Sequence, residues 1–136
     1  SEDTYIKSYL WKKEYDGKVI FGINFYDRFY EMLVKNKGTK IDIRIVHILV
    51  ELNRIMLSRI HYIEKSNNIS FGKECKDKVY ELMLETNIFQ NMVLKYNITK
   101  NEENYIKIIT KLKLLKKMQY KAFFLCYMEF DKILNV

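Results

Sequence analysis

Apolar residues recur every three or four positions along most of the chain, which is the spacing of helices that bury one face. We therefore expect an all-α fold, a single compact bundle of about five helices in which the third to fifth are long. The chain has only four glycines and no proline, and no linker-like change of composition divides it. Residues 1–136 are accordingly predicted to form one helical-bundle domain.

The first predicted helix covers residues 3–15 and ends at Gly17. Residues 19–21 follow between two glycines as an extended linker. The second helix begins at Asn24, a good N-cap, and stops at Gly38, which supplies a left-handed C-terminus. The residues that this second helix is expected to bury are Phe25, Phe29 and Leu33.

Three longer helices are predicted in the rest of the chain. Thr39 with Asp42 resembles a capping box for a helix that runs to about residue 65, although residues 41–45 alternate with period two and a short strand is the competing interpretation. Its expected buried stripe is Ile45, Ile48, Leu49, Leu52, Ile55, Met56, Ile60 and Ile63. Ser70 is the expected cap of the next helix, with the buried stripe Cys75, Val79, Leu82, Met83, Thr86, Phe89 and Val93. Thr99 with Glu102 opens the last helix, with the stripe Tyr105, Ile108, Ile109, Leu112, Leu115, Phe123, Cys126, Phe130 and Ile133.

The charge is concentrated in the last predicted helix. The chain has 24 basic and 17 acidic residues, a net charge of +7, yet residues 104–128 contain six lysines and no acid. These lysines are Lys107, Lys111, Lys113, Lys116, Lys117 and Lys121. On a helical wheel five of them lie opposite the buried stripe with Lys116 at its edge, and the same side carries Leu114, Met118, Phe124 and Leu125.

This lysine face has four competing interpretations. It can follow the phosphates of a nucleic acid, lie on an anionic membrane, or dock an acidic protein surface. It can also be neutralised within the chain, because Asp77, Glu81 and Glu85 form an acidic stripe on the preceding helix. Lysine outnumbers arginine by 20 to 4. This ratio weakens the nucleic-acid interpretation, since bidentate phosphate and base contacts favour arginine.

A second candidate binding surface lies on the first predicted helix. Trp11 and Tyr15 stand four residues apart on the side away from Ile6 and Leu10. An exposed Trp–Tyr pair is typical of a binding hot spot. The competing interpretation is that this helix buries both of its faces.

The sequence offers little material for catalysis. Four glycines cannot build a phosphate-binding loop, and two histidines without a metal-binding motif do not indicate a metal site, so we expect no cofactor and no metal. Both histidines lie on a polar stripe typical of a solvated helix face. Arg54 and His61, however, resemble the arginine-x(4–6)-histidine motif of HEPN ribonucleases. That resemblance implies His61 as general acid–base and Arg54 as phosphate stabiliser, without a metal.

The two cysteines, Cys75 and Cys126, both fall on apolar stripes. We expect buried thiols rather than a disulfide, which favours a reducing compartment such as the cytoplasm, that of a host cell included. The chain shows no signal-peptide pattern and no apolar stretch near the ~20 residues of a membrane span. The abundance of lysine, isoleucine, asparagine and tyrosine is typical of an AT-rich genome.

The first third of the chain resembles a known family. The run Tyr5-Ile6-Lys7-Ser8-Tyr9-Leu10-Trp11, then Arg28-Phe29-Tyr30-Glu31-Met32-Leu33 and Ile41-Asp42-Ile43-Arg44, is similar to the opening of poxvirus Bcl-type immunomodulators. The resemblance implies a non-enzymatic bundle that binds a host apoptotic or signalling protein through a groove or helical face. It covers about 45 residues, and the later helices lack that family's small-residue-rich central hairpin.

The expected function is a non-enzymatic protein–protein interaction module, either a viral or a parasite effector, that can also self-associate. Its predicted contact residues are Trp11, Tyr15, Lys107, Lys111, Lys113, Lys117 and Lys121. A basic-face protein for nucleic acid or anionic membranes and an HEPN-like ribonuclease stay open as alternatives. No small-molecule substrate is expected.

Overall fold

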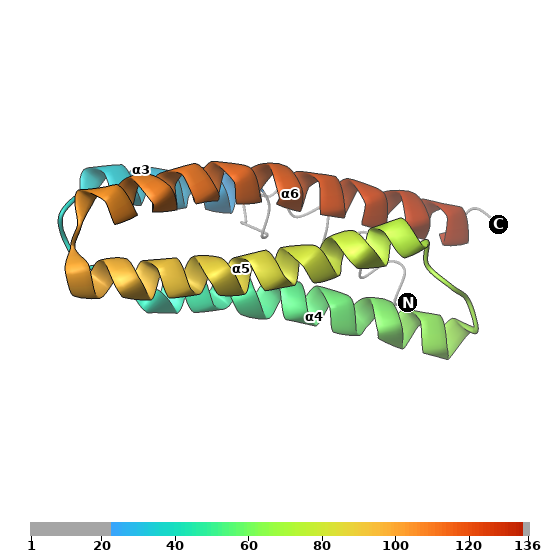
Figure 1. Ribbon diagram of the computed structural model, residues 1–136. Coiled ribbons are helices and arrows are strands. Elements are labelled where there is room, and N and C mark those ends of the chain that lie inside the picture. The colour runs from blue at the N-terminus through green and yellow to red at the C-terminus, as the bar shows by residue number, and fades with distance from the viewer. Residues whose placement is uncertain (1–22, 135–136) are drawn as a thin grey trace.

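The computed structural model describes residues 23–134, which form a bundle of helices only (Figure 1). The four helices in this range are α3 (Ile23–Lys35), α4 (Ile43–Asn67), α5 (Lys73–Thr99) and α6 (Glu102–Leu134). Successive helices run in opposite directions (Figure 1). Helix α5 packs against both α4 and α6, and the short α3 packs against α6. The predicted all-α class is confirmed.

The number of helices differs from the expected five, because the described residues contain four. These four correspond to the second to fifth predicted helices. The first predicted helix, residues 3–15, lies outside the described residues, and so do Trp11, Tyr15 and the predicted linker at residues 19–21.

The turn between α3 and α4 is held by side chains of α5. Gly38 adopts a φ of 89°, the left-handed conformation that the sequence predicted at the end of α3. The carboxamide of Asn97 accepts the N–H of Ile41 and donates to its carbonyl oxygen, both at 2.8 Å. Helix α4 then begins at Ile43, so the alternative of a strand over residues 41–45 is wrong. Its N-cap is Asp42, whose side chain accepts the Arg44 N–H at 3.0 Å, whereas the Thr39 hydroxyl donates to the Asn36 carbonyl.

The other two predicted caps are displaced as well, each by two residues. The N-cap of α5 is Gly72 and not Ser70. The cap of α6 comes from Asn101, whose side chain accepts the N–H groups of Glu103 and Asn104 at 2.7 and 3.4 Å. Between α5 and α6 only residues 100 and 101 are non-helical, and Lys100 takes the left-handed conformation with a φ of 51°.

The buried positions repeat with alternating steps of three and four residues. They include Val46, Leu49, Asn53, Met56, Ile60 and Ile63 on α4, Cys75, Val79, Leu82, Thr86, Phe89 and Val93 on α5, and Ile108, Leu112, Leu115, Gln119, Ala122 and Cys126 on α6. This heptad spacing is typical of helices that pack at shallow crossing angles. The seam that it buries is narrower than the apolar stripe predicted from the sequence, which was about 100° wide around the helix. The predictions for Ile48 and Ile55 are therefore wrong, because their side chains lie on the flank, 49% and 47% exposed.

Three buried side chains, those of Tyr26, Gln119 and Asn53, are joined by hydrogen bonds. The Tyr26 hydroxyl donates to Gln119 Oε1 at 2.8 Å, and Gln119 Nε2 donates to Asn53 Oδ1 at 3.1 Å. Asn53 Nδ2 donates in turn to the Leu49 carbonyl at 3.2 Å. Burial raises the pKa of Tyr26 far above its ordinary value, so this hydroxyl stays a donor. The three residues connect α3, α6 and α4 through the core.

A charged cluster holds the turn between α4 and α5. Glu64 Oε2 accepts the Phe71 N–H at 2.8 Å and the Lys76 ammonium at 3.0 Å. Burial alone raises the pKa of Glu64, but the Phe71 N–H and Lys76 outweigh it and hold the pKa below its ordinary value. The ionised form of Glu64 therefore stabilises the fold.

We predict that Gln119→Leu lowers the free energy of unfolding by about 2–4 kcal/mol, because it leaves the buried Tyr26 hydroxyl and the Asn53 Oδ1 without a partner. Urea denaturation measures this loss. The triple variant Tyr26→Phe/Asn53→Leu/Gln119→Leu removes all the orphaned groups and should recover most of the stability. A single variant as stable as the parent would contradict the prediction.

We predict that Glu64→Gln destabilises the protein at pH 7 and that this difference disappears in acid. The lowered pKa means that the ionised carboxylate contributes stability above the unfolded pKa of about 4.3 and loses it as the pH falls through the folded value. Urea denaturation from pH 7 down to pH ~3 measures both proteins. A difference that is independent of pH would show that the charge of Glu64 does not matter.

Candidate functional site

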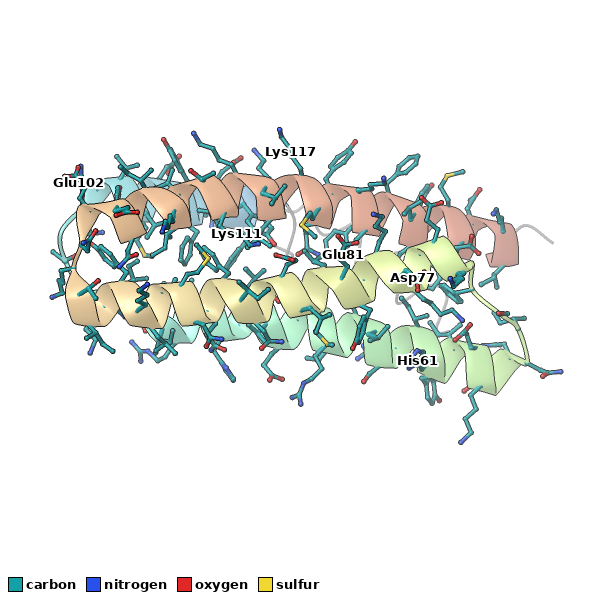
Figure 2. All side chains as sticks on the ribbon, in the orientation of Figure 1. His61, Asp77, Glu81, Glu102, Lys111 and Lys117 are labelled. Atoms are coloured by element: carbon teal, nitrogen blue, oxygen red, sulfur yellow. The ribbon has the colours of Figure 1, made fainter. Side chains whose placement is uncertain are left out.

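Half of the predicted lysine face is neutralised within the chain. Lys111 points into the space between α6 and α5 and bonds to Glu85 (Figure 2). Lys116 reaches Asp27 of α3 at 2.7 Å, and Lys107 pairs with Glu103 one turn earlier on α6 at 3.4 Å. These three amines therefore contribute to the bundle itself.

The predicted acidic stripe on α5 contacts the lysines of α6 at one position only. Glu85 pairs with Lys111, but Glu81 lies 3.4 Å from Lys78 and Asp77 lies 3.6 Å from Lys73, both on α5 itself. Asp77 and Glu81 sit on the part of α5 toward its N-terminus (Figure 2). Internal neutralisation of the lysine face is thus partial.

The other three lysines of the predicted face have no carboxylate partner among residues 23–134. Lys117 projects away from the bundle (Figure 2), and neither it nor Lys121 makes an ion pair in this range. Lys113 lies over the ring of Tyr30 on α3, 5.6 Å from the centroid. Since Lys113, Lys117 and Lys121 succeed one another at four-residue steps, their like charges repel by about 0.2–0.5 kcal/mol per pair.

Large apolar side chains lie between these lysines. Leu114 and Phe124 are exposed as predicted, while Met118 and Leu125 turn toward the core and are partly buried. Tyr120 and Met128 are exposed as well and were not predicted, although their helical spacing from Lys117 places them on the same side. We define the α6 outer face as Lys113, Leu114, Lys117, Tyr120, Lys121, Phe124 and Met128. It extends for about 22 Å along the helix.

The candidate ribonuclease pair lies on the opposite part of the bundle. Arg54 and His61 are both exposed and stand two turns apart on one side of α4, where Figure 2 marks His61. Arg54 is bound to Glu51, and His47 Nε2 lies 3.9 Å from the same carboxylate group. Glu51 therefore competes with a phosphate for Arg54, and the ribonuclease role stays a prediction.

A groove between α3 and α4, with a volume of about 270 Å³, is mainly apolar. It is lined by Phe25, Arg28, Phe29, Met32 and Ile45, and so contains neither a nucleophile nor a general base. Within residues 23–134 no three His, Cys, Asp or Glu side chains lie close enough together to hold a metal ion.

The two cysteines are buried free thiols, as predicted. Their sulfur atoms meet across the contact of α5 with α6, 2.9 Å apart. The hydrogen bond to Cys75 and burial raise the pKa of Cys126 well above its ordinary value. A thiol with a raised pKa is a poor nucleophile, so this pair fits a packing role.

No protein-family model, curated protein or solved structure matches the chain. The resemblance to poxvirus Bcl-type proteins therefore stays a prediction that depends on the residues alone. In its described part, Phe29 and Leu33 are buried in the core and Tyr30 lies beneath Lys113. No helix within residues 23–134 combines the length and the apolar character that a membrane span needs.

Two lysines of the predicted face allow a matched test of these placements. The Lys111 and Glu85 side chains are only 18% and 27% exposed, whereas Lys117 faces solvent. Lys111→Glu sets two carboxylates against each other and should lower the free energy of unfolding by about 2 kcal/mol. Lys117→Glu makes the same change of charge and should cost less than about 0.5 kcal/mol. Equal losses in urea denaturation would contradict the assignment of Lys111 to the bundle.

Proposed function

We propose that this protein is a non-enzymatic interaction module that binds an acidic protein surface through the α6 outer face. The observation that carries the proposal is the combination of three lysines that lack a carboxylate partner in residues 23–134 with four exposed apolar side chains on one side of one helix. The mutual repulsion of these lysines is relieved when carboxylates of a partner lie beside them.

The apolar members of the face supply the binding energy that charge alone lacks. Exposed ion pairs contribute only up to about 1 kcal/mol each, whereas burial of aromatic and methionine side chains forms the centre of most interfaces. Tyr120, Phe124 and Met128 are the candidates for this centre, and Lys117 and Lys121 lie at its rim. An amphipathic helix with glutamates beside an apolar stripe has the matching chemistry.

Nucleic acid and anionic membranes are the rival partners of this face. Helix α6 contains no arginine, although arginine makes the bidentate contacts that are common at phosphates. Tyr120, Phe124 and Met128 follow one another at four-residue steps on a packed helix, and such a narrow row suits a partner helix better than a lipid surface. A protein partner therefore agrees best with the residues present.

A titration with a labelled acidic peptide tests the proposal. The probe is a synthetic amphipathic helix that carries glutamates at four-residue steps beside a leucine stripe, and fluorescence anisotropy reports its binding. Lys117→Glu/Lys121→Glu should weaken binding by at least tenfold, which corresponds to about 1.4 kcal/mol. Phe124→Ser should weaken it by a similar factor and should leave the salt dependence unchanged.

The matched control is Lys40→Glu/Lys65→Glu, which changes the net charge equally at exposed lysines that are not part of the α6 outer face. This variant should keep the affinity within about twofold at ~150 mM salt, because distant surface charges are screened there. Equal losses in both double variants would overturn the proposal. Tighter binding to phosphatidylserine vesicles or to a single-stranded oligonucleotide would assign the face to a membrane or a nucleic acid instead.

The enzyme alternative makes an opposite prediction. An HEPN-like ribonuclease would cleave RNA without metal, and His61→Ala would abolish that cleavage. If the protein is an interaction module, neither the parent nor His61→Ala cleaves RNA. A host signalling or apoptotic protein is the partner class that the resemblance implies, and it stays a prediction.

A further inference from the structure

The outward side of α5 carries a second row of exposed side chains that is distinct from the α6 outer face. Residues 86–94 contain no charged side chain, although the chain as a whole is 30% charged. Leu84 and Ile88, 43% and 48% exposed, lie at the middle of the row. Asp77, Glu81, Asn91 and Lys95 extend it in both directions, and all four are exposed. We name these six residues the α5 outer face.

The α5 outer face repeats with its own heptad spacing. Its members, at residues 77, 81, 84, 88, 91 and 95, follow one another at alternating steps of four and three. Such a row keeps to one side of a helix and fits into the holes of a partner helix at a shallow crossing angle. The core seam of α5 uses a different set of residues, and within residues 23–134 no second helix covers the α5 outer face. Its Asp77 and Glu81 pair with Lys73 and Lys78 of α5 itself.

We propose that the α5 outer face is a homodimer interface in which two copies of α5 pack antiparallel about a twofold axis near residue 86. In this register Leu84 of one copy meets Ile88 of the other, and the twofold axis generates the same contact a second time. Glu81 then lies opposite Asn91, whose amide can donate to the carboxylate. Asp77 lies opposite Lys95, which makes no ion pair among the described residues. Each of these three residue pairs is complementary, and the twofold axis generates each pair twice.

The neighbouring registers do not have this complementarity. If one copy of α5 slides along the other by one heptad, Leu84 meets Lys95 and Ile88 meets Asn91. A slide of one heptad in the opposite direction sets Asp77 against Ile88. In the proposed register the flanking residues Tyr80 and Leu94, which are also exposed, meet across the interface. Glu85, the flanking carboxylate near the axis, is already neutralised by Lys111 of its own chain. The interface extends for about 27 Å and is small, which predicts a dissociation constant in the micromolar range.

Sedimentation of the whole chain between ~5 and ~500 µM tests the proposal. We expect a monomer–dimer equilibrium that Ile88→Glu shifts to the monomer by at least tenfold. The matched control Ile55→Glu places the same charge on an equally exposed isoleucine of α4 and should leave the equilibrium unchanged. A monomer at every concentration, or equal effects of the two variants, would overturn the proposal.

A charge exchange tests the register. Asp77→Lys and Lys95→Asp each set like charges against each other, so each should weaken the dimer several-fold, and the double variant should restore it. Residues 77 and 95 lie about 27 Å apart on one helix, so restoration can only come from contacts between two copies. Circular dichroism checks that each variant folds. A double variant that dimerises more weakly than both single variants would contradict the antiparallel register.

A cross-link gives an independent measurement. In the proposed register Asn87 of one copy lies beside Asn87 of the other copy at the axis, whereas the two Asn91 residues lie about 15 Å apart along the helices. Asn87→Cys should form a covalent dimer with oxidised glutathione, and Asn91→Cys should not. The α6 variant Lys117→Glu/Lys121→Glu should dimerise like the parent, and Ile88→Glu should bind the acidic peptide like the parent. The proposed function and the dimer can therefore fail separately.

Discussion

A chain of hydrogen bonds from Tyr26 through Gln119 to Asn53 passes through a core that is otherwise almost entirely apolar. Apolar seams tolerate small slides and rotations of one helix against another, but a buried carboxamide that loses its partner costs the full penalty of desolvation. The three residues come from α3, α6 and α4, so their bonds select one rotation for each of these helices. That rotation decides which side chains of α6 face solvent, and hence the composition of its outer face.

The sequence predicted the buried side of α5 and α6 well, because long helices with regular apolar spacing have only one way to face a core. It missed Gln119 and Asn53, since a polar residue at a seam position looks like a surface residue until its partner is known. The caps show a related limit. Thr39, Ser70 and Thr99 each have another capping candidate within three residues, and the contact of Asn97 with Ile41 helps to set where α4 begins.

The six lysines of α6 illustrate why a candidate binding face is harder to predict than a fold. Their placement on one side of the helix follows from spacing alone. Whether each one is neutralised depends on carboxylates distant in sequence, such as Glu85 for Lys111 and Asp27 for Lys116. A difference of six residues between Lys111 and Lys117 separates an amine that stabilises the bundle from one that is available to a partner.

The connection between α5 and α6 consists of two residues, with Lys100 in the left-handed conformation and Asn101 as the cap. So short a turn loses little entropy when the loop closes, and local contacts of this kind are associated with fast folding. We therefore expect the α5–α6 hairpin to form early, before the more distant contacts of α3 are made. Both proposed interfaces lie on this hairpin, so a whole chain that refolds from denaturant would present them to a partner while the rest of the bundle is still assembling.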